Sequence, residues 1–125
     1  MYLVDTNIFL EILLKQEKSK ECKKFLEKNI GKLNITDFSL HSIGVILFKQ
    51  NKDELFLKFI NDTLPKTDIV SLPKNQYYQV IDNKRKLGLD FDDSYQYSIC
   101  KNYGFKLKTM DQDFQGIEDI DVLFL

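Results

Sequence analysis

Short apolar runs alternate with longer stretches of helical periodicity along the whole chain. The runs have the length of buried strands and lie at residues 2–4, 33–36, 69–70, 105–109 and 122–125. The longer stretches are predicted as helices at residues 8–14, 22–30, 38–48, 53–64, 73–87 and 92–103. Alternating strands and helices favour right-handed crossovers and a mainly parallel sheet covered on both faces. The pattern therefore predicts an α/β fold with three layers.

Polar and turn-forming residues add detail to two of these helices. Residues 8–14 are apolar almost all round, so this helix is expected to be buried. Its polar exception is Glu11, which we expect to face solvent rather than a pocket. The helix that starts near residue 73 is expected to turn Tyr77, Val80 and Ile81 inward and to end just before Gly88.

Length and composition indicate one soluble domain over residues 1–125. The chain is 43% hydrophobic and 30% charged, which suits a folded core. Eighteen Lys and Arg almost balance nineteen Asp and Glu, so contact with a phosphate backbone depends on local patches. Cys22 and Cys100 fall at apolar helical positions and are expected to be reduced, buried thiols, which fits the cytoplasm. No apolar run approaches the roughly 18–20 residues of a membrane span.

Acidic residues gather where predicted strands end or where a helix opens toward a strand. Asp5 follows the first strand, Asp111 and Asp113 follow strand 105–109, and Asp92-Asp93 open the helix before it. Ligands of parallel sheets lie at the carboxyl ends of the strands, so these distant residues are expected to meet there. Neighbouring carboxylates repel one another unless protons or hard cations compensate them. The sequence therefore suggests a site for Mg²⁺ or Mn²⁺.

Three alternatives stand beside this metal-site interpretation. Each aspartate, taken singly, also suits a helix N-cap, which needs no metal. His41 could act as a replacement ligand or general acid, although histidine beside an apolar helix face is more often a hydrogen-bonded structural residue. A phospho-receiver or phosphatase-like domain also places aspartates at strand ends. A receiver would carry its acidic pair after the first strand, whereas this chain carries the pair late.

Three short motifs resemble the PIN-domain family, which includes the toxin ribonucleases of VapC-type toxin–antitoxin pairs. They are Val4-Asp5-Thr6-Asn7, Leu89-Asp90-Phe91-Asp92-Asp93-Ser94 and Thr109-Met110-Asp111-Gln112-Asp113-Phe114. Their order and spacing run through the whole chain. The resemblance implies a metal-dependent endoribonuclease that cuts RNA, with an antitoxin protein as a partner and a homodimer as a common assembly.

The resemblance also assigns roles to individual residues. It implies that Asp5, Asp93 and Asp111 bind the metal and that Asp113 completes the catalytic set as an outer partner. Asp111 and Asp113 remain alternatives for the last ligand, and Asp92 is a less favoured substitute for Asp93. The residues implied to orient substrate or to shape the site are Thr6, Asn7, Ser42, Asp92 and Thr109.

One position departs from the family pattern. Family members usually carry a glutamate on the helix after the second strand, and the matching position here is Ser42. Serine supplies no negative charge, so metal would be held more weakly or would depend on a carboxylate from elsewhere. The alternative function is a catalytically weakened PIN-fold module that binds RNA or protein.

Overall fold

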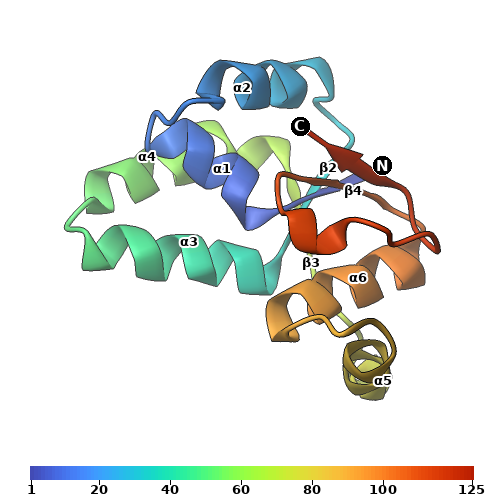
Figure 1. Cartoon of the computed structure of the whole chain (residues 1–125). Helices are drawn as coiled ribbons and strands as arrows, with labels where there is room; N and C mark the ends of the chain where they lie inside the picture. The colour runs from blue at the N-terminus through green and yellow to red at the C-terminus, as the bar shows by residue number, and fades with distance from the viewer.

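A five-stranded parallel sheet forms the centre of the protein. The computed structural model describes residues 1–125, and the strand order is β3-β2-β1-β4-β5 (Figure 1). The strands are β1 (Tyr2–Val4), β2 (Leu33–Thr36), β3 (Asp68–Val70), β4 (Lys106–Thr109) and β5 (Val122–Phe124). All four strand pairs are parallel. The α/β fold predicted from the sequence is confirmed.

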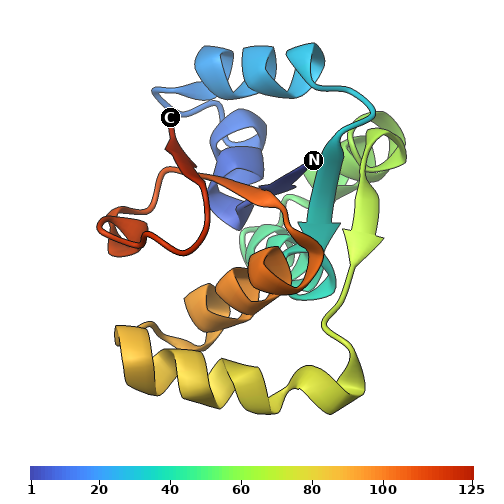
Figure 2. The same ribbon diagram turned by 90° about the vertical axis from the view of Figure 1, so that its right-hand side faces the viewer.

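Helices cover both faces of this sheet. They are α1 (Thr6–Leu13), α2 (Ser19–Lys28), α3 (Asp37–Lys49), α4 (Asp53–Asp62), α5 (Tyr78–Leu87) and α6 (Phe91–Tyr103). Short 3₁₀ turns lie at Leu64–Lys66, Lys74–Gln76 and Gln112–Phe114. Helices α5 and α6 lie side by side at the bottom of both ribbon views, and α2 lies at the top (Figures 1 and 2). None of the helices has the length and apolar character needed to cross a bilayer.

Two hydrophobic cores lie on the opposite faces of the sheet. Successive residues of a strand point to opposite faces, and in β1 the fully buried Val4 and Leu3 belong to different cores. Val4 packs with residues of α1 to α4, among them Phe9 and Phe59. Leu3 packs with residues of α5 and α6, among them Tyr97. Each face of the sheet is therefore covered by its own set of helices.

The region around α5 departs from the sequence-based expectation. The chain forms the 3₁₀ turn Lys74–Gln76 first, and α5 begins only at Tyr78. Val80 is buried as predicted, but Tyr77 is 42% exposed and Ile81 is 53% exposed, so the prediction that these two point inward was wrong. The reason is that α5 packs mainly on α6, which leaves only a narrow buried stripe. Strand β3 likewise forms an edge of the sheet, and its Ile69 is 53% exposed rather than buried.

Glu11 is buried, contrary to the expectation that it faces solvent. Its side chain is 7% exposed, and its Oε2 atom accepts a hydrogen bond of 2.8 Å from the backbone N–H of Lys18. Lys18 is the residue that precedes α2. The first backbone N–H groups of a helix have no partner within the helix. Glu11 therefore supplies a partner at the start of α2 from the neighbouring helix.

The two cysteines are free and buried, as predicted. They belong to different cores, because Cys22 packs with the α1 to α4 side and Cys100 with the α5 and α6 side. Burial raises the pKa of the Cys22 thiol to about 11 and also raises the pKa of Cys100. Both thiols are therefore protonated near neutral pH and act as small apolar residues.

Candidate functional site

The acidic residues meet at the carboxyl ends of β1 and β4. These strands are adjacent in the sheet, and their register pairs Val4 with Lys108. The chain continues from β1 toward one edge of the sheet and from β4 toward the other, so a topological switch point lies between them. Asp5 directly follows β1, and its backbone N–H donates to the Lys108 carbonyl at 2.9 Å. Asp111 comes two residues after the end of β4.

Asp5 is held by side chains from distant parts of the chain. It is 4% exposed. Its Oδ2 atom accepts a hydrogen bond of 2.7 Å from Thr109 Oγ1, and its Oδ1 atom accepts one of 2.9 Å from Gln96 Nε2. Asp5 occupies the N-cap position of α1, yet its side chain makes no capping hydrogen bond to that helix. An ordinary N-cap role therefore does not account for this carboxylate.

Asp93, Asp111 and Asp113 form a close acidic group. One carboxylate oxygen from each of them lies within 4.8 Å of the others. Asp93 is buried in the first turn of α6, Asp111 is partly exposed and Asp113 is exposed. Asp111 also caps the last 3₁₀ turn, because its Oδ1 atom accepts from the Asp113 backbone N–H at 2.9 Å. Asp5 lies outside this closest group but belongs to the same charged neighbourhood.

Burial and mutual repulsion make the ionised forms of these carboxyls unfavourable. Burial, followed by the charge of Asp111 and other nearby aspartates, raises the pKa of Asp93 to about 8. Burial and the charge of Asp5 raise the pKa of Asp92 to about 6. Burial also raises the pKa of Asp5, although its hydrogen bonds act in the opposite direction. Ionised carboxylates at this density require a compensating positive charge.

The atoms gathered here suit a hard divalent cation. All the charged groups are carboxylates, and oxygen ligands of this kind are those that Mg²⁺ and Mn²⁺ prefer. A further oxygen, Gln96 Oε1, is buried without a hydrogen-bond partner in the protein, and the nitrogen of the same amide contacts Asp5 and Asp92. Asn7 Oδ1, on the residue two positions after Asp5, is likewise buried and unpaired. Buried polar atoms normally have a partner, so such atoms suggest a bound group. The residues present therefore fit a metal site.

Thr109 and Thr6 support the site in different ways. The Thr109 hydroxyl donates to Asp5 and accepts from the backbone N–H of Asp111 at 2.9 Å, so one side chain fixes both aspartates. The Thr6 hydroxyl donates to Ser39 Oγ at 2.8 Å. Ser39 in turn donates its backbone N–H to the side chain of Thr36, which caps α3. Thr6 thus ties the start of α1 to the start of α3.

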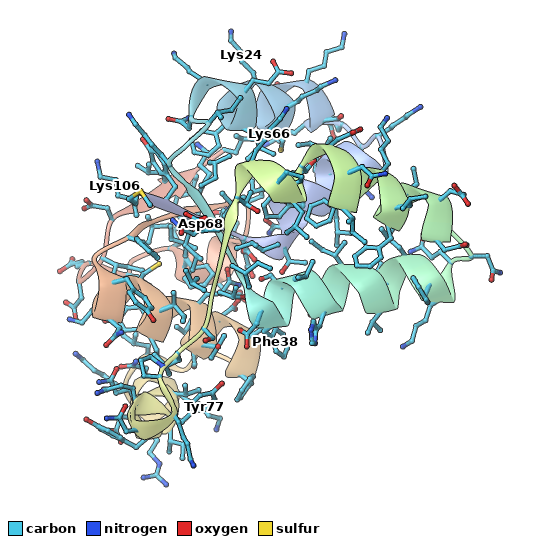
Figure 3. The ribbon with its side chains drawn as sticks, turned by 180° about the vertical axis from the view of Figure 1, so that it is seen from behind. Lys24, Phe38, Lys66, Asp68, Tyr77 and Lys106 are labelled. Atoms are coloured by element: carbon cyan, nitrogen blue, oxygen red, sulfur yellow. The ribbon has the colours of Figure 1, made fainter.

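Ser42 and His41 line a groove with aromatic walls. The groove runs between the start of α3 and the first turns of α5 and α6, and its other lining residues are Asp37, Phe38, Val45, Ile46, Tyr77, Phe91 and Tyr95. Figure 3 shows Phe38 at the start of α3, above Tyr77 at the start of α5. His41 is exposed and makes no side-chain hydrogen bond in the protein, so the expected structural hydrogen bond is not formed. Neither Ser42 nor His41 belongs to the close acidic group.

Gln96 is a residue of this site that sequence reasoning missed. It is fully buried in α6, and its amide lies between the carboxylates of Asp5 and Asp92. A signal for it exists in the sequence. Gln96 follows Asp92 by four residues, which places both on one side of the helix. A glutamine on a helix with so many buried residues needs a polar partner.

Comparison with known proteins identifies the fold. The family model for the PIN domain matches residues 2–120. A toxin–antitoxin complex from Klebsiella pneumoniae is 19% identical, with a TM-score of 0.78 and coverage of 98% of this chain and 96% of that chain. VapBC2 from Rickettsia felis, bound to a DNA fragment from its promoter, is 16% identical, with a TM-score of 0.82 and coverage of 98% and 97%.

A third similar structure is a toxin that cleaves the sarcin-ricin loop. It is VapC20 from Mycobacterium tuberculosis, which is 11% identical, with a TM-score of 0.79 and coverage of 96% of this chain and 98% of that chain. No curated protein matches the sequence. At these identities the solved structures establish the likeness of fold, and the family model covers nearly the whole length of the chain. The chain therefore belongs to the PIN-domain family.

Proposed function

We propose that this protein is a divalent-metal-dependent endoribonuclease that hydrolyses RNA phosphodiester bonds. The observation that carries the proposal is the acidic group of Asp93, Asp111 and Asp113, with ligand atoms within 4.8 Å of one another and Asp5 beside them. The group lies at the sheet edge where α/β proteins bind ligands. The similarity of fold to a toxin described as cleaving the sarcin-ricin loop supports RNA as the substrate.

The carboxylates of Asp5, Asp93 and Asp111 are proposed to hold Mg²⁺ or Mn²⁺, with Asp113 as a further ligand or outer partner. A bound divalent cation would lower the pKa of water and neutralise charge on a phosphoryl oxygen. The Thr109 hydroxyl keeps Asp5 and the Asp111 loop in fixed positions through its two hydrogen bonds. The exposed Asp113 lies on the solvent side, where substrate would enter.

The setting that we infer is a type II toxin–antitoxin pair in the cytoplasm. Similar structures include toxin–antitoxin complexes, two of them with DNA fragments. An antitoxin would be encoded by a short reading frame beside the gene for this chain. Co-expression should then yield a stable complex, and size-exclusion chromatography of the complex would also report whether this chain forms a homodimer.

An RNA cleavage assay with matched variants tests the nuclease activity. Asp5→Asn and Asp93→Asn should each reduce Mn²⁺-dependent cleavage by at least about 100-fold, because a cation ligand is lost. Asp82→Asn removes one charge from an exposed position of α5 and should cleave like the wild type. Circular dichroism would show that the variants remain folded. Full cleavage by both site variants would refute the proposal.

A second candidate function is a PIN-fold module that binds RNA or protein without cutting. Ser42 favours it, since this side chain lines the groove beside Asp37 and brings no carboxylate to the site. Ser42→Glu restores the charge found in the family pattern. A gain of metal affinity and cleavage by this variant would indicate a degenerate site. No gain, together with cleavage by the wild type, would indicate that the carboxylates already present suffice.

A further inference from the structure

The amide of Gln96 joins two carboxylates that come from different elements. Its Nε2 atom donates to Asp5 Oδ1 at 2.9 Å and to Asp92 Oδ1 at 3.3 Å. Asp5 lies at the end of β1, whereas Asp92 lies in the first turn of α6. Ionised carboxylates only accept hydrogen bonds, so the amide must turn its nitrogen toward them. The orientation of Gln96 is therefore fixed by its neighbours.

The carbonyl oxygen of the same amide has no partner in the protein. Gln96 is 0% exposed, and its Oε1 atom is buried and makes no hydrogen bond. This oxygen shares a carbon with the nitrogen that contacts Asp5 and Asp92, so it too lies beside the acidic group. An unpaired buried acceptor is costly. Its place among carboxylates provides one more oxygen for a cation or for the water around it.

Glutamine is well matched to this position because its donors are neutral. A lysine would also pair with the carboxylates, but its charge would take the place of a cation. A glutamate would add a third negative charge next to Asp5 and Asp92. An apolar residue would leave both carboxylates without this donor. Only a neutral donor fixes the two carboxylates and keeps their negative charge available.

We propose that Gln96 is a positioning residue of the metal site, and that it holds Asp92 beside Asp5 as the carboxylate that Ser42 does not provide. The inference rests on the proposed metal-dependent function. Asp92 is partly buried and interacts electrostatically with Asp5 and Asp111. The helix after β2 contributes no carboxylate at Ser42, and α6 supplies one instead.

Calorimetric titration with Mg²⁺ and Mn²⁺ tests this inference independently of catalysis. Asp92→Asn and Gln96→Met should each weaken binding by about 10-fold or more, as loss of an outer partner of a metal ligand does. The fold-loss of metal affinity in the double variant should be smaller than the product of the two single fold-losses, because both changes remove the same Gln96–Asp92 hydrogen bond. Asp90→Asn is the matched control, since its carboxylate contacts the Asp93 backbone and not Gln96.

The outcomes separate the inference from the proposed function. No metal binding by the wild type overturns both. If the wild type binds metal and the Asp92→Asn and Asp90→Asn variants have equal metal affinities, the inference alone is overturned. Metal affinity would then depend only on the total negative charge near the site. If Gln96→Met does not fold, Gln96→Glu replaces it in the titration. That variant should melt earlier than the wild type in EDTA and recover with Mg²⁺, and unchanged melting in EDTA would also overturn the inference.

Discussion

Replacing Asp93 by Asn tests whether the acidic group is held together against its own repulsion. Asp93 is 4% exposed, and its folded-state pKa is about 8, against an ordinary value of 3.8. The folded chain therefore keeps a proton that the unfolded chain loses between about pH 4 and about pH 8. The stabilising effect of that proton is fully present below about pH 4 and is lost as the pH rises through about 8. The metal-free wild type should lose stability across this window.

The size of the effect follows from the difference between the two pKa values. The difference of about 4 between the two pKa values corresponds, without any screening, to about 5–6 kcal/mol in the free energy of unfolding. Solvent reaches the group from the side of the exposed Asp113 and screens the charges, so we expect about 1–2 kcal/mol. A chain of 125 residues has an unfolding entropy of about 0.26 kcal/mol/K. The stability difference then corresponds to about 4–8 °C in Tm.

Thermal melts in EDTA over a series of pH values measure this effect. At about pH 4 the Tm of Asp93→Asn should equal that of the wild type. Above about pH 8 the Tm of the variant should be about 4–8 °C higher than that of the wild type. Added Mg²⁺ should raise the Tm of the wild type and have little effect on the variant, because a ligand that binds only the folded state stabilises it. Asp82→Asn, an exposed charge change on α5, should follow the wild type throughout. A difference in Tm between Asp93→Asn and the wild type that does not change with pH would refute the reasoning.

Three further predictions concern residues around the site. Thr109→Val removes the 2.7 Å hydrogen bond to Asp5 and should lower the free energy of unfolding by about 1–3 kcal/mol in urea titrations, whereas Thr109→Ser should stay near the wild type. Glu11→Ala should cost about 1 kcal/mol in the same measurement because α2 loses a partner for its first turn, and Glu11→Gln should cost less. Cys22 and Cys100 should react with a thiol reagent at neutral pH only after unfolding, and rapid labelling of the native protein would contradict their burial.

Periodicity and strand-end chemistry were enough to predict most of the fold. The strands have short apolar runs and the helices have amphipathic spacing, so local sequence specifies both. Gly88 ends α5 with a φ of +71°, as its position after the helix predicts. The meeting of Asp93 with Asp111 follows from parallel topology, because the crossover helix α6 begins at the same edge of the sheet where β4 ends.

Contacts made by single polar side chains could not be predicted in the same way. Glu11 is buried because a neighbouring helix begins beside it, which depends on how α1 and α2 pack. Gln96 contacts a residue 91 positions away, and nothing near it in sequence indicates that partner. The exposure of Ile81 depends on how little of α5 is covered by α6. Such details depend on tertiary packing, which local patterns do not record.

The adjacency of β1 and β4 has a consequence for synthesis on the ribosome. Asp5 is translated before Thr109, its hydrogen-bond partner, which follows 104 positions later. A nascent chain that has not yet released β4 from the exit tunnel lacks both this partner and the Asp111 loop. The catalytic centre that we propose would therefore be completed only after β4 has emerged, so an incomplete nascent chain would not cleave the ribosomal and messenger RNA around it.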